Sequence, residues 1–306
     1  MATASVSVSI PTEASHRTPS GQPVHPTPPP TMSTQQQQSQ PNTKSLSPAY
    51  IETHAILTRL LTTLQSPASP YHTTYSPWIT HYGIAPLTTS LLSCIRPTVW
   101  TFLSTPRWSL DALKQISSHP GDLRYEGRAI YLNGILGLDK RLRGYVGQTT
   151  CLRQRVAQHL NFRYRRDHPS LHYWALQRSV FNVFAVLAVL PPTAQPSGPG
   201  LGMEEVPLVL NVLEMLMCLV FRSLPVESLR EWLPIDGHGH EHGESGTGIA
   251  SSNWRRVSRE GVMGGLNIAC PLDQGVTQLK ERPFVDLRDD EDELVKEWLR
   301  EMDRER

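Results

Sequence analysis

One stretch of the chain, residues 129–159, constrains the fold most strongly. It opens with an apolar segment that contains Tyr131 and passes through a turn rich in glycine and charged residues. A second short segment then carries Tyr145-Val146-Gly147. Two apolar segments joined by such a turn predict a β-hairpin over residues 127–147.

The segment that follows the hairpin, residues 150–165, has its apolar side chains at helical spacing. It predicts one helix that carries Arg155 and His159 four residues apart on one face. The expected buried face of this helix consists of Leu152, Val156 and Leu160. The hairpin and the helix together bring two tyrosines, an arginine and a histidine within reach of one another.

The later elements are strongly apolar. Residues 180–190 are rich in valine and phenylalanine and stop at two prolines, which predicts a third, buried strand. Residues 206–224 predict an apolar helix in which Glu214 is the one acid. Residues 264–273 predict a tight turn and a short extended piece. The expected fold class is therefore α+β, with a small sheet flanked by helices.

Composition divides the chain into four parts. Residues 1–47 are Ser, Thr, Pro and Gln with few apolar side chains, so we expect a disordered tail. Residues 48–120 have apolar residues at helical spacing and predict a helical extension, in which Ser109 caps a helix. Residues 121–280 form the main domain, with a flexible insertion at about residues 226–260.

The last part, residues 281–306, predicts an acidic amphipathic helix that docks on the domain or on a protein partner. Asp289 and Asp290 suit its positive N-terminal end. Its apolar stripe consists of Leu294, Trp298 and Met302. The N-terminal tail is a second candidate for binding a protein partner.

Charge is unevenly distributed although the net charge is only +1. Residues 121–190 carry 11 Lys/Arg against 4 Asp/Glu, a net of +7. Residues 281–306 carry 11 acids against 6 Lys/Arg, a net of −5. A basic middle and an acidic end fit a polyanion site beside a solvating or competing tail.

Several classes of protein are excluded by pattern. The four cysteines form no CxxC pair, which indicates free thiols and not a zinc site. No run of about 18 apolar residues predicts a membrane span, and the N-terminus lacks a secretory signal. We expect an intracellular protein of the nucleus or cytoplasm, with the mitochondrion left open. Three histidines in the insertion, His238, His240 and His242, fit a weak metal scavenger or a solvated loop.

The ordered set of these residues resembles the GIY-YIG nuclease family. Ala129-Ile130-Tyr131 corresponds to its first motif and Tyr145-Val146-Gly147-Gln148-Thr149 to its second. The similarity covers roughly residues 127–222, with a closing segment at 264–270. Further positions that match the family are Arg155, His159, the downstream His168, Glu214 and the late Asn267. The chain departs from the family by Ala129 in place of glycine, by a long hairpin turn and by a long segment before Asn267.

The resemblance implies a mixed or antiparallel sheet flanked by helices and a metal-dependent endonuclease that cuts DNA with one Mg²⁺ or Mn²⁺. Glu214 would hold the metal, and Arg155 the scissile phosphate. Tyr131 would orient or deprotonate water, aided by Tyr145 and His159. The expected nucleic-acid-binding residues are Arg163, Arg165, Arg166 and His168, with Tyr164 and Tyr173 beside them.

Each candidate also has a simpler interpretation. Glu214 could pair with Arg222 or Arg178, Tyr131 could be a core aromatic residue, and the arginine run could be a solvated face. Two alternatives to an active nuclease follow from these interpretations. One is a catalytically silent nucleic-acid-binding or protein-interaction module with the same fold, and the other is a helical scaffold with a fortuitous motif match.

Overall fold

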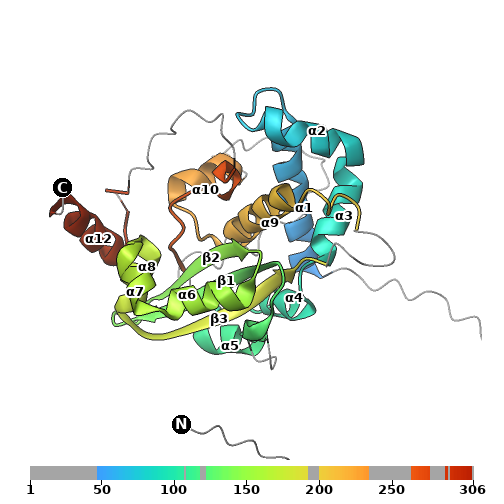
Figure 1. The fold of residues 1–306 in the computed structure, drawn as a ribbon. Coiled ribbons are helices and arrows are strands. Elements are labelled where there is room, and N and C mark those ends of the chain that lie inside the picture. The colour runs from blue at the N-terminus through green and yellow to red at the C-terminus, as the bar shows by residue number, and fades with distance from the viewer. Residues whose placement is uncertain are drawn as a thin grey trace, which may run out of the picture. The chain divides into compact units, whose positions relative to one another are not determined.

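A four-stranded mixed sheet with the order β3-β1-β2-β4 lies at the centre of the fold (Figure 1). The computed structural model describes residues 47–106, 108–117, 122–191, 200–233, 263–275, 287–288 and 290–304. The four strands are β1 (Ala129–Gly137), β2 (Leu142–Thr149), β3 (Ser179–Val189) and β4 (Gly264–Gly265). The predicted hairpin and third strand are confirmed, and so is an α+β class with a mixed sheet.

Eleven described α-helices and two short 3-10 helices flank this sheet. The helices before the sheet are α1 (Pro48–Gln65), α2 (His72–Tyr82), α3 (Ile84–Ser93), α4 (Pro97–Leu103), α5 (Leu110–Ser117) and η1 (Asp122–Arg124). Between and after the strands come α6 (Leu152–Leu160), α7 (Phe162–Asp167), α8 (Leu171–Gln177), α9 (Val206–Phe221), α10 (Val226–Trp232), η2 (Pro271–Asp273) and α12 (Glu293–Arg304).

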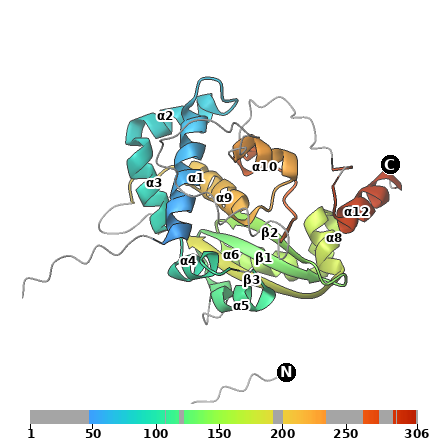
Figure 2. The same cartoon turned by 180° about the vertical axis from the view of Figure 1, so that it is seen from behind.

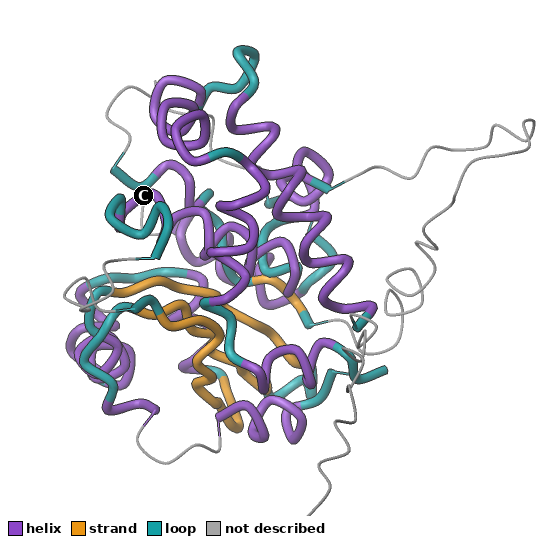
Figure 3. The backbone as a smooth tube through the Cα atoms, turned by 90° about the vertical axis from the view of Figure 1, so that its right-hand side faces the viewer, coloured by secondary structure: helices purple, strands orange, loops and turns teal. Residues whose placement is uncertain are grey.

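Strand register assigns the side chains of the hairpin to two faces. Ile130 and Leu132 of β1 share one face with Val146 of β2, and they pack into the large apolar core formed with α1–α5 and α9. Tyr131 faces the other way, into smaller clusters under α6, α8 and α12. Figure 2 shows α1, α2, α3 and α9 together on one side of the strands, and Figure 3 shows helices and strands from the side.

Ser109 caps helix α5 of the extension as predicted, because its hydroxyl accepts a hydrogen bond from the Ala112 amide at 3.2 Å. The described residues from 47 onward form one compact unit, so the extension shares its core with the sheet. No single described helix is long and apolar enough to cross a membrane. Helices α9 and α10 together are long and apolar enough, but they are bent by 111° relative to one another.

Several predictions about these elements need correction. Residues 150–165 form two helices, because the Asn161 side chain caps a new helix by accepting bonds from the amides of Arg163 and Tyr164. Leu160 is the last residue of α6 and is 56% exposed, whereas the sequence predicted a buried side chain. β3 is buried only in its second half, since Val180 and Phe181 are exposed at its start.

The other two corrections concern the C-terminal half. Residues 226–232 do not belong to a flexible insertion, because they form α10 and Trp232 packs into the core. The last helix starts at Glu293, where the Asp292 carboxylate accepts a bond from the Leu294 amide and so caps it. The predicted tail up to residue 46, the three insertion histidines, and Asp289 lie outside the described residues.

The last helix docks on the sheet through a buried arginine. Arg143 of β2 is 1% exposed at its side chain, and its guanidinium donates two bonds to Asp292 and two to Asp139, at 2.6–3.0 Å. Burial alone would raise the pKa of Asp292, but the bonds from Arg143 outweigh it and the pKa is lowered. Leu294 and Trp298 add apolar contact, as the predicted stripe requires.

Replacement of Arg143 by methionine is expected to destabilise the fold by about 3 kcal/mol, because the largely buried Asp292 loses its counter-charge. Urea unfolding measures the loss. Arg153→Met is the matched control, since its ion pair with Glu126 is about two-thirds exposed on both sides and should change stability by less than about 1 kcal/mol. Equal effects of the two replacements would contradict docking of α12 through Arg143.

Candidate functional site

Tyr131 lies at the centre of the candidate site and is fully buried, with an exposed fraction of 0%. It pairs in register with Gly147 on the neighbouring strand β2. A Cβ atom added to Gly147 would collide with the phenol ring and hydroxyl of Tyr131. The ring of Tyr131 therefore lies across β2 in space that only glycine leaves open.

A hydrogen-bonded chain starts at the Tyr131 hydroxyl. Its oxygen lies 2.6 Å from Nε2 of His159, and Nδ1 of His159 lies 3.0 Å from the Tyr173 hydroxyl. Nε of Arg155 donates to the Tyr131 oxygen at 3.3 Å. Since Arg155 can only donate, the Tyr131 proton points to Nε2, and Nδ1–H of His159 then donates to Tyr173.

His159 is neutral in this arrangement. Burial lowers its pKa to about 3, with a further contribution from the positive charge of Arg155. A neutral imidazole can accept the Tyr131 proton at Nε2. The helix α6 thus presents Arg155 as a donor and His159 as an acceptor to one phenol oxygen, as their four-residue spacing predicted.

Tyr145 closes the other side of the network. Its ring stacks on His172 with a centroid separation of 4.0 Å and an angle of 4°, and lies 6.4 Å from the ring of Tyr131. Burial raises the pKa of Tyr145 to about 12, the negative charge of Glu214 adds to this, and Arg155 opposes it.

Glu214 approaches from the opposite face of the sheet, on the apolar helix α9. Its side chain is 3% exposed, and its Oε2 accepts a bond from Nε2 of Gln274 at 3.0 Å. Burial raises its pKa to about 8, while bonds from Gln274 and Gln148 and the charge of Arg155 limit the rise. Among the described residues no lysine or arginine forms an ion pair with this carboxylate.

The simpler partners proposed for Glu214 are occupied elsewhere. Arg178 pairs with Glu297 at 3.6 Å and lies over the ring of Trp174. The charge of Arg222 acts on Glu52 of α1. The negative charge of Glu214 raises the pKa of Tyr131 and of Tyr145, and the charge of Arg155 lowers the pKa of Glu214.

Burial is the largest cause of a strongly raised pKa at Tyr131, and Tyr145 adds to it, while Arg155 lowers it. With these neighbours alone the phenol keeps its proton at neutral pH. Ionisation of Tyr131 needs an added positive charge or transfer of its proton to His159.

The donor set fits a hard divalent cation. A lone carboxylate with a raised pKa gains stability from a positive charge, and Mg²⁺ or Mn²⁺ accepts one carboxylate while keeping several waters. Within the described parts of the chain no group of three or more His, Cys, Asp or Glu side chains could enclose a metal. A cation at Glu214 would therefore be held by one protein carboxylate and by water.

The predicted nucleic-acid-binding residues divide into two sets. Arg165 is half-buried and turns inward, where Nη1 donates to the His159 carbonyl oxygen at 3.4 Å. Arg163 and Arg166 are exposed on α7, and Arg166 pairs with Asp167. The exposed His168 caps α7 and stacks on Tyr164, which in turn meets Arg155.

Tyr173 does not belong to the surface patch in which the sequence placed it, because it is buried against His159. His172, beside it, was missed. The available signal was a His-Tyr pair inside the apolar segment of α8, where buried polar side chains require partners.

Asn267 completes the edge of β2. Its side-chain amide accepts from the Val146 amide at 2.9 Å and donates to the Val146 carbonyl at 2.7 Å. The side chain thus pairs with the strand as a neighbouring backbone would, one residue after Tyr145. Its role in the site is to hold β2 in place.

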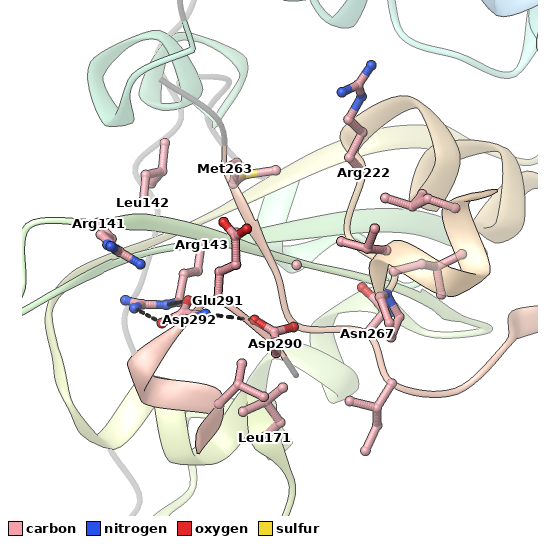
Figure 4. Close-up of a pocket in the computed structure, with 18 of the residues that line it drawn as sticks. Arg141, Leu142, Arg143, Leu171, Arg222, Met263, Asn267, Asp290, Glu291 and Asp292 are labelled. Carbon is pink, nitrogen blue, oxygen red and sulfur yellow. Dashed lines mark hydrogen bonds and ion pairs between the residues drawn. The ribbon is translucent and has the colours of Figure 1, made fainter. Parts of the chain in front are cut away.

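A separate cavity of 1110 Å³ lies around Arg143, away from the tyrosine pair (Figure 4). Asp290, Glu291 and Asp292 line one side of it, and Arg143 is bonded to Asp292 there. Its wall also includes the residues that border two stretches outside the described chain, Leu233, Met263 and Leu287. We assign this cavity no ligand.

Comparison of the chain with models of known protein families, with characterised proteins and with solved structures finds no match.

Replacement of Gly147 by alanine is expected to destabilise the fold by about 1–3 kcal/mol, because the new methyl group must displace the buried ring of Tyr131. Urea unfolding measures the change. The matched control is Gly144→Ala in the same strand, whose new methyl group meets the flexible end of Met263. If Gly147→Ala costs no more than Gly144→Ala, the packing of Tyr131 over β2 is contradicted.

The lowered pKa of His159 predicts an acid-dependent loss of stability. The unfolded imidazole binds a proton below about pH 6.5, whereas the folded one does so only near pH 3. The free energy of unfolding should therefore fall with decreasing pH across this window, by about 1.4 kcal/mol per pH unit for this group. Urea unfolding at several pH values should give a shallower slope for His159→Gln than for wild type, and equal slopes would refute a neutral buried His159.

Proposed function

We propose that this protein is a metal-dependent endonuclease of the GIY-YIG type that hydrolyses phosphodiester bonds in DNA. One observation carries the proposal. Tyr131, Tyr145, Arg155 and His159 gather on one face of the sheet, and the charge of Glu214, on the other face, acts on both tyrosines. The basic segment around the site and the exposed arginines of α7 suit a DNA backbone.

The chemistry follows from the donors and acceptors present. A cation bound at Glu214 would neutralise charge at the phosphate and acidify a water. Arg155 donates hydrogen bonds to a phosphate oxygen and offsets the charge that develops there. The Tyr131 oxygen accepts a proton from the attacking water while its own proton passes to Nε2 of His159. The water oxygen then bonds to phosphorus as the bond to the leaving oxygen breaks, and the leaving oxygen takes up a proton from solvent.

A second function, nucleic-acid binding without cleavage, is favoured by the complete burial of Tyr131. A phenol with no exposed surface reaches an attacking water only if its neighbours shift when DNA binds. The silent module and the nuclease share the fold and the basic face. They differ in whether Glu214 is needed for anything beyond folding.

Cleavage of linear, nicked and branched DNA with Mg²⁺ or Mn²⁺ tests the nuclease. Glu214→Gln is expected to lower the cleavage rate by about 100-fold or more, since the neutral amide is a poor metal ligand. Affinity for DNA, measured by fluorescence anisotropy, should stay within about threefold. The exposed Glu227→Gln on α10 is the matched control and should cleave as wild type does.

Two outcomes would overturn the proposal. A wild-type chain that binds DNA and cleaves none of the substrates supports the silent module. A Glu214→Gln variant that cleaves at the wild-type rate would show that the hydrolysis does not use this carboxylate.

A further inference from the structure

The carboxylate of Glu214 is the end of a chain of side-chain amides. Its Oε2 accepts from Nε2 of Gln274 at 3.0 Å, and Gln148 lies close enough to lower the pKa of Glu214. Gln148 lies on β2, three residues after Tyr145, and Gln274 follows η2. Two segments that are 126 positions apart in sequence therefore fix one buried carboxylate.

The amides also bind one another. Nε2 of Gln148 donates to Oε1 of Gln274 at 2.9 Å and to Oδ1 of Asn211 at 2.7 Å. Nδ2 of Asn211 donates to the backbone carbonyl of Gln274 at 2.9 Å. Asn211 precedes Glu214 by three residues on α9, so both face the same side of the helix. Both N–H groups of Gln148 find acceptors within this ring, which favours an ordered polar network.

The ring is tied to the N-terminal helical layer by a tyrosine. Nδ2 of Asn211 donates to the Tyr75 hydroxyl at 3.0 Å, and that hydroxyl donates to the Leu272 carbonyl at 3.2 Å. Tyr75 lies on α2 and is fully buried. Nearby, the hydroxyl of Tyr71 donates to the Asp273 carboxylate at 2.6 Å. Helix α2 thus holds the turn from which Gln274 projects.

We infer that Gln148, Asn211 and Gln274, anchored by Tyr75, are positioning residues that hold the Glu214 carboxylate toward the divalent cation of the proposed site. The inference rests on the proposed function and assigns the helical extension a part in it. α2 does not touch the tyrosine network, but it fixes the turn that orients the metal ligand. Partners of a ligating carboxylate affect metal affinity by about 10- to 100-fold in other sites.

Mn²⁺ binding without DNA, followed by electron paramagnetic resonance of the free ion, tests the inference. Gln274→Met keeps the side-chain volume and removes the donor, and is expected to weaken Mn²⁺ binding about tenfold or more. Tyr75→Phe should weaken it less, by about threefold, because it removes only the anchor. The matched control is Tyr82→Phe on the same helix α2, which should bind Mn²⁺ as wild type does.

A double variant separates positioning from general loosening of the fold. Because both residues act through one link, Tyr75→Phe combined with Gln274→Met should bind Mn²⁺ no more weakly than Gln274→Met alone. Thermal unfolding of each variant confirms that it is folded. Unchanged Mn²⁺ affinity in Gln274→Met, or full additivity of the two replacements, would overturn the inference.

The outcome is separable from that of the nuclease assay. If Mn²⁺ binds through Glu214 and weakens in Gln274→Met while wild type cleaves no DNA, positioning stands and the nuclease fails. If wild type cleaves and Gln274→Met needs no more Mn²⁺ for half-maximal cleavage, the nuclease stands and positioning fails. If the Glu214→Gln variant binds Mn²⁺ as tightly as wild type does, the positioning inference is overturned.

Discussion

A carboxylate buried inside the most apolar helix of the chain is the constraint on which the rest of the site depends. Glu214 is 3% exposed on α9, and burial raises its pKa to about 8. A charge at such a position costs several kcal/mol unless donors or a cation compensate it. Amides from Gln274 and Gln148 and the charge of Arg155 provide part of that compensation, and they come from three separate elements.

The two faces of the sheet carry different parts of the site. On one face, the ring of Tyr131 lies over Gly147 and shares its hydroxyl between His159 and Arg155. On the other face, the helical layer anchors Asn211 through Tyr75. Contacts on the α9 face thus fix the geometry at Glu214, while its charge acts on the tyrosines of the other face.

Local patterns predicted the elements that make up this site. The hairpin, the helix with Arg155 and His159, and the apolar helix with Glu214 all follow from spacing and from turn chemistry. Local competition explains one error: the Asn161 side chain caps a new helix, which ends α6 and leaves Leu160 exposed. A propensity argument over residues 150–165 does not detect that competition.

Contacts between residues distant in sequence form the parts of the site that the sequence did not predict. His172 and Tyr173 reach the network only because α8 packs on the sheet, and no spacing connects them to Tyr131. The amides of Gln148, Asn211 and Gln274 meet across 63 to 126 positions of chain. A lone polar residue in an apolar helix, such as Asn211 three residues before Glu214, was the one visible sign that a partner was required.

The most direct test of the central claim is anomalous diffraction from crystals of the protein soaked in Mn²⁺. The account predicts one Mn²⁺ peak within about 2–2.6 Å of a Glu214 carboxylate oxygen, with water as its remaining ligands. The same soak of Glu214→Gln should give no peak there. Mn²⁺ bound elsewhere with none at Glu214, or a Glu214 carboxylate that keeps only its amide partners at saturating Mn²⁺, would contradict it.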